Sequence, residues 1–301
     1  MHLNLISIFI SLLIIILQFP AYESSSSSSE PPPPHPTTKH FVLVHGSCHG
    51  AWSWYKLVAL MKSSGGGHNN VTALDLAASG IDSKQVKNLT SIADYFQPLM
   101  EFMEALPLHE RVILVGHSLG GLAVSMAMER FPSKISVAVF LTASMPGPDL
   151  NISTLNQEVF SRQGSLLDSI YTYDDGPNNL PTTFTFGPLF LASNVYQLSP
   201  TQRDCNIDWA LATTLMRPLR LFSEEDMSRE LVLSWENYGS VKRVFIVSDE
   251  DMVADKDFVW WMIKKNPPHQ VVEIKGSDHM VMMSKPRQLW THLLDIASKN
   301  T

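Results

Sequence analysis

Arg111-Val-Ile-Leu-Val-Gly-His-Ser-Leu-Gly-Gly121 is the stretch on which the fold prediction depends. Its opening run, 111–115, is mostly apolar and predicts a buried strand, and the pattern from Leu119 onward predicts a helix. Between them, a serine stands in a Gly-x-Ser-x-Gly turn. A strand, a sharp turn that exposes a serine and a helix together form a nucleophile elbow. Ser118 is therefore the candidate nucleophile, and Gly116 and Gly120 leave room for close approach of the backbone.

The same alternation of strand and helix extends outward along the chain. The predicted strands cover residues 41–45, 71–76, 111–115, 137–141, 241–247 and 271–274, and predicted helices include 52–61, 92–106 (with a bend at Pro98) and 119–130. Continuous apolar runs of this kind suit strands that are buried on both faces. Strands that alternate with helices predict right-handed crossovers and a doubly wound, mostly parallel α/β sheet.

Residues from about 146 to 222 break this alternation and are rich in aromatic residues and proline. A structureless loop of that length is improbable in a compact domain. The segment is predicted to be an inserted, mostly helical cap whose apolar face covers a pocket. The alternative is a peripheral helical layer with packing of its own.

The first forty residues lie outside the folded pattern. Leu5 to Phe19 is an apolar run, shorter than the roughly 20 residues of a membrane-spanning helix, and predicts a signal peptide or uncleaved signal anchor over residues 1–22. Residues 23–38 form a Ser/Pro-rich linker before the folded domain, 39–301. The leader predicts the secretory pathway, with membrane contact only through the apolar segment; without a functional leader the protein is cytoplasmic. In a secreted chain, three sequons are candidate glycosylation sites: Asn70, Asn88 and Asn151.

Composition limits the partners. The formal net charge is −7 and Lys and Arg form no cluster, so no nucleic-acid partner is expected. The two cysteines, Cys48 and Cys205, are too few for a disulfide framework or a cysteine metal site, and are expected to be free thiols.

A serine nucleophile needs a histidine base and a carboxylate that orients it. In this arrangement the chain order is serine, acid, histidine. His279 is the best candidate base because it lies in the turn after the last predicted strand. His117 is predicted to point away from the site on its tight turn, and His269 lies at the opposite end of the sheet.

The acid is drawn from a carboxylate cluster at the correct edge of the sheet. Asp249, Glu250 and Asp251 follow the strand 241–247, with Asp255 just beyond. The spacing leaves open which of them accepts a hydrogen bond from His279. Asp278 is excluded because a residue adjacent to the histidine cannot readily reach the second ring nitrogen.

The tetrahedral intermediate also requires an oxyanion hole. One N–H is expected from Leu119, the residue after the nucleophile, at a helix N-terminus. The other is expected from Ser47 in the loop His45-Gly-Ser-Cys-His-Gly50 that follows the first strand. Cys48 has no paired base in this arrangement and is not expected to be a catalytic thiol.

Several motifs in the correct order resemble the plant methylesterases and hydroxynitrile lyases, a family of α/β-hydrolases. They are His40-Phe-Val-Leu-Val-His-Gly-Ser-Cys-His-Gly-Ala-Trp52, Val71-Thr-Ala-Leu-Asp-Leu-Ala-Ala-Ser-Gly80, Val112-Ile-Leu-Val-Gly-His-Ser-Leu-Gly-Gly121, Gly239-Ser-Val-Lys-Arg-Val244 and Glu273-Ile-Lys-Gly-Ser-Asp-His-Met280. The resemblance extends from about residue 39 to the C-terminus. It implies the α/β-hydrolase fold, no cofactor and a Ser118, Asp251 and His279 triad. It also places the oxyanion N–H groups on Ser47 and Leu119.

The resemblance favours the esterase branch. The lyases most similar to this chain carry a hydroxyl side chain at the position of Gly46 and a lysine at that of Met280. Met280 cannot stabilise an anion, but with Ser47, Ser118 and His279 it is expected to contact the substrate. His117 and Leu119 also match the esterases.

The predicted function is hydrolysis of small methyl esters, such as methyl salicylate, methyl jasmonate, methyl indole-acetate or alkaloid esters. The expected partner is therefore a small apolar ester, and a homodimer is the candidate assembly. Two alternatives stay open: a ligand-binding protein with residual esterase activity, and a lyase or decarboxylase on the same fold.

Overall fold

The computed structural model describes residues 38–301 except 64–68, 163, 200–206 and 301. The predicted leader, 1–22, and nearly all of the linker, 23–37, lie outside the described residues, as does Cys205. Within the described ranges, no helix combines the length and hydropathy that crossing a membrane requires. The sequon residues Asn70, Asn88 and Asn151 are all exposed.

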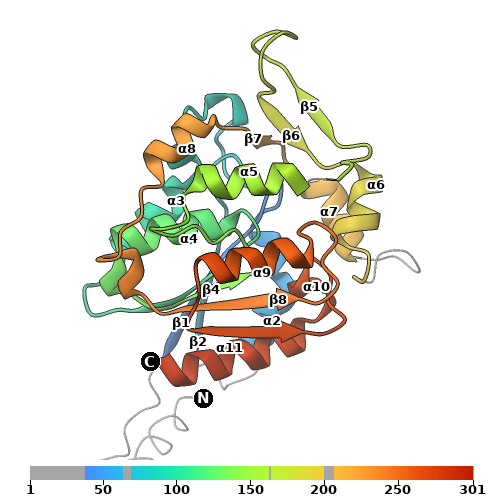
Figure 1. Ribbon diagram of the computed structural model, residues 1–301. Coiled ribbons are helices and arrows are strands. Elements are labelled where there is room, and N and C mark those ends of the chain that lie inside the picture. Colours follow the sequence, from blue (N-terminus) through green and yellow to red (C-terminus); the bar gives the residue numbers. More distant parts are fainter. Residues whose placement is uncertain (1–37, 64–68, 163, 200–206, 301) are drawn as a thin grey trace, which may run out of the picture. The chain divides into compact units, whose positions relative to one another are not determined.

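A parallel sheet forms the centre of the described chain (Figure 1). In these residues its six strands run in the order β2-β1-β3-β4-β8-β9, and every pair is parallel. The strands are β1 (Lys39–Val44), β2 (Asn69–Leu74), β3 (Val112–His117), β4 (Ile135–Leu141), β8 (Arg243–Ser248) and β9 (Gln270–Ile274). The fold class is therefore as predicted, with strand ends that differ from the predicted ends by up to a few residues.

Helices cover both faces of the sheet. Successive side chains of a strand point to opposite faces, so the apolar strands present side chains that need burial on each face. Leu43 and Val115 pack in one buried cluster with α2 and α11, whereas Val44 and Leu114 pack in the other with α3 and α4. The flanking helices are α2 (Tyr55–Ser63), α3 (Ile92–Ala105), α4 (Gly120–Arg130), α9 (Lys256–Lys265), α10 (Val281–Ser284) and α11 (Pro286–Asn300). Short 3-10 turns cover Ala51–Trp54 (η2), Val86–Asn88, Pro132–Lys134 and Tyr238–Ser240.

Helix α3 begins at a capping box, in which Ser91 accepts from the Asp94 N–H while the Asp94 carboxylate accepts from the Ser91 N–H. Its residues continue in helix through Pro98 to Ala105.

The segment predicted to form the cap, about 146–222, is not simply helical. It contains α5 (Ile152–Arg162), α6 (Pro188–Phe190), a π-helical turn η5 (Leu191–Val195) and α7 (Ile207–Leu215), and α8 (Glu224–Glu230) follows it. It also contains a small antiparallel sheet in the order β5-β6-β7, which the sequence did not predict: β5 (Ile170–Thr172), β6 (Thr183–Thr185) and β7 (Leu219–Arg220). Strands of two or three residues are too short to show a two-residue period.

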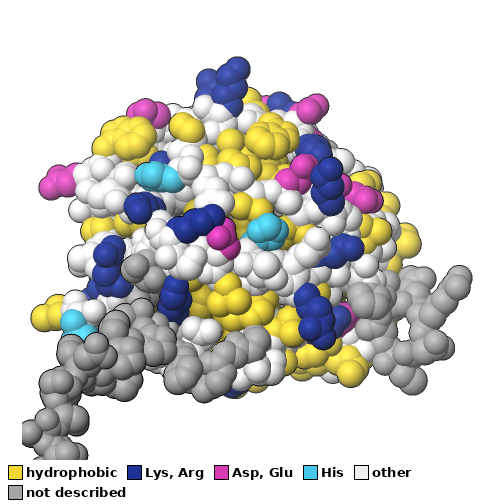
Figure 2. Space-filling model, turned by 90° about the horizontal axis from the view of Figure 1, so that it is seen from below, with side chains coloured by type: hydrophobic (Ala, Val, Ile, Leu, Met, Phe, Trp, Pro, Cys, Tyr) yellow, Lys and Arg dark blue, Asp and Glu magenta, His cyan; other side chains and the backbone are white. Residues whose placement is uncertain are grey.

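The surface seen from below is mixed in charge (Figure 2). Lys and Arg side chains are scattered among neutral and acidic groups, and on the described part of this face they do not form a continuous basic band.

Candidate active site

The candidate nucleophile lies on a sharp turn between β3 and α4. Ser118 has a φ of +54°, in the left-handed region that non-glycine residues rarely adopt. Its backbone carbonyl accepts hydrogen bonds from Gly121 N (3.1 Å) and Ser144 N (3.1 Å), which hold the strained residue in place. A Cβ on Gly120 would lie 2.6 Å from the His45 carbonyl oxygen, so glycine is required where the turn meets the loop after β1.

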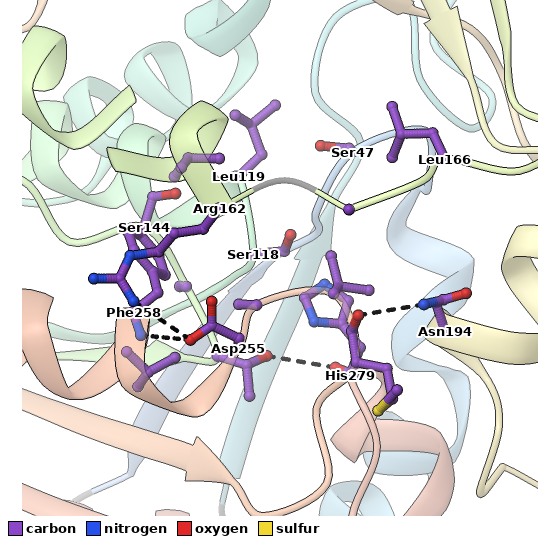
Figure 3. Close-up of a pocket in the computed structure, with 18 of the residues that line it drawn as sticks. Ser47, Ser118, Leu119, Ser144, Arg162, Leu166, Asn194, Asp255, Phe258 and His279 are labelled. Carbon is purple, nitrogen blue, oxygen red and sulfur yellow. Dashed lines mark hydrogen bonds and ion pairs between the residues drawn. The ribbon is translucent and has the colours of Figure 1, made fainter. Parts of the chain in front are cut away.

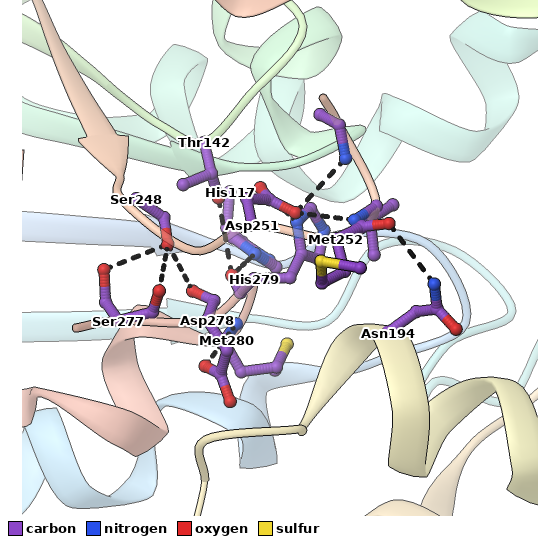
Figure 4. Close-up of polar contacts among 12 residues, drawn as sticks. His117, Thr142, Asn194, Ser248, Asp251, Met252, Ser277, Asp278, His279 and Met280 are labelled. Carbon is purple, nitrogen blue, oxygen red and sulfur yellow. Dashed lines mark hydrogen bonds and ion pairs between the residues drawn. The ribbon is translucent and has the colours of Figure 1, made fainter. Parts of the chain in front are cut away.

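His279 and Asp251 form a buried pair beside this turn. His279 Nδ1 lies 2.8 Å from Asp251 Oδ2, and the two side chains are only 5% and 4% exposed. Because an ionised carboxylate only accepts, Nδ1 carries the hydrogen and Nε2 is left as the acceptor. The other oxygen, Asp251 Oδ1, accepts from the N–H groups of Val253 (2.8 Å) and Ala254 (3.2 Å), so the carboxylate is fixed in orientation (Figure 4).

The other carboxylates of the cluster have different contacts. Asp249 pairs with Lys256 (3.0 Å), and Asp255 caps α9 by accepting from Phe258 N (2.8 Å). Asp278 accepts from main-chain N–H groups and from a serine hydroxyl, as the exclusion from the sequence required. Only Asp251 among these has a described hydrogen bond to the His279 ring.

Two histidines contact the site in ways that the sequence did not reveal. His117 does not line the cavity; its Nε2 lies 2.9 Å from the His279 carbonyl oxygen, and the centroids of the two rings are 4.8 Å apart. His49 Nδ1 lies 2.7 Å from the Ser47 carbonyl oxygen and its Nε2 lies 2.7 Å from the Tyr196 hydroxyl. Burial lowers the pKa of His49 to about 4, so this ring is neutral near pH 7.

Two backbone N–H groups are available near Ser118. Among the described residues, the N–H groups of Ser47 and Leu119 have no protein acceptor, and both residues line the same cavity as Ser118 and His279. Cys48, beside Ser47, is a buried free thiol whose pKa burial raises to about 12. A thiol with so high a pKa is not a nucleophile near neutral pH.

A cavity of about 380 Å³ lies above these groups, between the sheet and the cap. Figure 3 shows Ser118 and His279 facing it. Aromatic side chains from the cap form much of the cavity wall. The rings of Phe186 and Phe190 are stacked with their centroids 5.4 Å apart, and the ring of Phe184 meets that of Phe186 edge to face with centroids 4.9 Å apart. The cavity thus suits a mostly apolar ligand.

Met280 does not line the cavity, contrary to the predicted substrate contact. It is fully buried and packs in the core with Val281 and Met282, and it is not among the cavity-lining residues. A substrate contact from its side chain is not supported, because the side chain is buried in this core cluster and does not line the cavity. Ser47, Ser118 and His279 do line the cavity.

Arg162 is the one cationic side chain among the described residues of the cavity wall. It forms an ion pair with Glu158 (2.6 Å) and lies 3.8 Å from Asp255. Its charge is therefore already balanced by two carboxylates. No group of His, Cys, Asp and Glu in the described ranges is arranged to hold a metal ion.

The fold and the site define an α/β hydrolase, and the family model described as "Alpha/beta hydrolase family" matches residues 41–291. The chain belongs to the plant methylesterase branch of that family.

Three relatives illustrate this membership. The chain is 54% identical over 259 residues to methyl jasmonate esterase 1 of Vitis vinifera, covering 86% of this chain and 96% of that protein. It is 46% identical over 263 residues to salicylic acid-binding protein 2 of Nicotiana tabacum, covering 87% and 98%. Among solved structures, tomato methylketone synthase I in complex with 2-tridecanone is 57% identical with a TM-score of 0.82, covering 88% and 99%.

Proposed function

We propose that the chain is a carboxylesterase that hydrolyses methyl esters of small plant hormones or specialised metabolites, through Ser118, His279 and Asp251. The observation that carries the proposal is the buried His279–Asp251 pair beside a serine with a φ of +54°, at the floor of an aromatic cavity. The similarity to methyl jasmonate esterase 1 supports a methyl ester as the substrate class.

The geometry assigns each residue of the site a role in the hydrolysis. The Ser118 hydroxyl attacks the ester carbonyl while His279 Nε2 takes its proton, because Asp251 keeps the hydrogen on Nδ1. The N–H groups of Ser47 and Leu119 stabilise the oxyanion. His279 then donates the proton to methoxide, methanol leaves, and a water activated by the same histidine hydrolyses the acyl-enzyme.

The balanced charge of Arg162 supports a neutral substrate. Because Glu158 and Asp255 lie beside Arg162, the cavity wall offers no surplus positive charge to a free carboxylate elsewhere on the acyl group. The aromatic wall favours an apolar acyl chain or ring.

A methanol-release assay over methyl jasmonate, methyl salicylate, methyl indole-acetate and an alkaloid methyl ester tests the function directly. The Ser118→Ala variant is expected to lose at least about 10³-fold in kcat, and Asp251→Asn roughly 10⁴-fold because the wrong tautomer of His279 results. Near-normal methanol release from Ser118→Ala overturns the mechanism. Absence of both methanol release and fluorophosphonate labelling in the wild-type chain favours a ligand-binding protein instead.

A second candidate is decarboxylation of a β-keto acid. It is favoured by the 57% identity to tomato methylketone synthase I, a histidine-to-alanine variant of which was solved in complex with β-ketoheptanoate. Carbon dioxide release from β-ketoheptanoate, compared with methanol release from the ester panel, distinguishes the two reactions.

The cellular compartment of the protein is a separate proposal. The apolar run from Leu5 to Phe19 supports entry into the secretory pathway. Fusion of residues 1–38 to a fluorescent reporter tests it: a cytosolic reporter contradicts the proposal.

A further inference from the structure

One short segment of the cap contacts all three loops that carry the candidate site. This segment, residues 194–199, is called the cap strap here. It begins in the π-helical turn η5 and ends at Ser199.

The first contact is to the oxyanion loop. The hydroxyl of Tyr196, a fully buried residue, lies 2.7 Å from His49 Nε2, and the two rings are stacked 5.8 Å apart. The partners define the hydrogen positions: the Ser47 carbonyl only accepts, so His49 Nδ1 donates to it. Because burial keeps this histidine neutral, its Nε2 is the acceptor and Tyr196 is the donor. The strap thus holds the ring that fixes the Ser47 main chain.

The second contact is to the acid loop. Gln197 Nε2 donates to the Glu250 carbonyl oxygen (2.6 Å), and Asn194 Nδ2 donates to the Met252 carbonyl oxygen (3.4 Å; Figure 4). These two carbonyls belong to the residues on either side of Asp251. The strap therefore holds the acid loop on both sides of the carboxylate that orients His279.

The third contact is to the loop of the base. Asp278 is fully buried, and its Oδ2 accepts from Leu198 N (3.0 Å), Ser199 N (2.6 Å) and Ser199 Oγ (2.8 Å). Its Oδ1 accepts from Met280 N (3.0 Å). One carboxylate thus joins the strap to the backbone immediately after His279. Hydrogen bonds to a buried carboxylate are stronger than neutral ones, and each donor withdrawn leaves charge uncompensated.

We propose that the cap strap is a positioning element: seating of the cap on these three loops aligns the oxyanion N–H of Ser47, the carboxylate of Asp251 and the ring of His279. The cap then encloses the ligand and aligns the catalytic groups in the same step. The inference rests on the proposed function, since it assigns a role within the same triad. It predicts that the strap affects turnover more than binding, because catalysis is sensitive to displacements below 1 Å.

The test removes one hydroxyl from the strap. Tyr196→Phe retains the buried ring but leaves His49 Nε2 without its donor. The matched control is Tyr238→Phe, which removes an equally buried hydroxyl that accepts from Asn266 (2.9 Å) away from the three loops. Each variant is measured for kcat and KM on the best methyl ester, for the rate of Ser118 labelling by a fluorophosphonate, and for Tm.

The expected result for Tyr196→Phe is a fall in kcat and in labelling rate of roughly 5- to 20-fold, with KM within about twofold, while Tyr238→Phe changes neither rate. A rise in KM alone overturns the proposal, because the strap then only encloses the ligand. Unchanged kinetics, or an equal loss in Tyr238→Phe, also overturns it.

If Tyr196→Phe does not fold, Ser199→Ala replaces it. This variant removes one of the three strap donors to Asp278 and is expected to lower both rates by a similar factor; unchanged rates overturn the proposal. The labelling rate does not depend on a methyl ester. A wild-type chain that labels rapidly but releases no methanol therefore contradicts the proposed function while leaving the strap comparison intact.

Discussion

His117 donates from Nε2 to the main-chain carbonyl of His279 over 2.9 Å, although the two residues are 162 positions apart. The ring stays neutral, because burial, with the neighbouring His279 as a smaller cause, holds the pKa of His117 well below its usual range. A neutral ring that donates from Nε2 has an unprotonated Nδ1, and this buried atom has no partner among the described residues. His117, the residue before the nucleophile, thus holds the main chain of the base, His279, through a hydrogen bond.

Replacement of His117 should therefore affect the base without touching it chemically. His117→Leu removes the donor and leaves the His279 carbonyl with only the longer contact from Thr142 Oγ1 (3.4 Å). We expect kcat to fall by about tenfold, with most of the loss restored in His117→Gln, whose amide nitrogen reaches a similar position. Steady-state kinetics on the wild type and both variants provide the check. Wild-type turnover in His117→Leu would show that this contact does not position His279.

The fold was predictable because its strands are buried on both faces and so appear as continuous apolar runs. All six predicted strands are present, with shifted ends; the last but one begins at Arg243 instead of Val241. The cap was predictable as an insertion but not as a partly β structure. Its strand β6 pairs with Leu219–Arg220, more than thirty residues away, and neither segment has a local pattern.

The site was predictable where chain order and a motif coincide, as for Ser118 and His279. The choice among Asp249, Glu250 and Asp251 required the family resemblance, because three adjacent carboxylates occupy the same edge of the sheet. The conformation of the loop decides which of the three carboxylates faces His279, and the spacing of residues in the sequence does not determine that conformation. The contact of His117 depends likewise on a side-chain direction at a strained turn.

Gly46 brings the oxyanion loop against the nucleophile. A Cβ at this position would lie 2.7 Å from Ser118 Cβ and 3.0 Å from His117 Nδ1, so either the loop or the nucleophile must move. Gly46→Ala is expected to lower kcat/KM by roughly 10- to 100-fold and the unfolding free energy by about 1–3 kcal/mol. Kinetics and Tm measured on the same preparation test this. Unchanged values of both would mean that the loop relaxes without cost.

His49 should make stability depend on pH. Burial is the main cause that lowers its pKa to about 4, and His45 and His279 act in the same direction. In the unfolded chain a histidine titrates near 6.5. Between these values the unfolded state binds a proton that the native state excludes, so the unfolding free energy decreases as the pH falls from about 7 to about 4. The decrease from this residue is about 3 kcal/mol and ends below pH 4.

Urea unfolding at several pH values from 7 to 4.5 measures this dependence. His49→Gln should reduce the slope without abolishing it, because burial also lowers the pKa values of His45 and His117. His109→Gln, at an exposed position, is the matched control and should retain the wild-type slope. Identical slopes in all three proteins would contradict the assignment to His49.

The cap has a second attachment at Asp208 of α7, which follows the cap strap in the sequence. This carboxylate is buried; it accepts from the Tyr55 hydroxyl (2.6 Å) and pairs with Lys56, at the start of α2. Lys56→Met removes the ammonium group that pairs with this carboxylate and is expected to cost roughly 3 kcal/mol of unfolding free energy, because breaking a buried ion pair is strongly destabilising. Adding Asp208→Asn to that variant should restore part of the loss, since the buried side chain at position 208 then carries no charge. A double-mutant cycle by urea unfolding measures this coupling. Additive losses would mean that Lys56 and Asp208 stabilise the cap independently, whereas a restored double variant identifies the ion pair as a single attachment between cap and core.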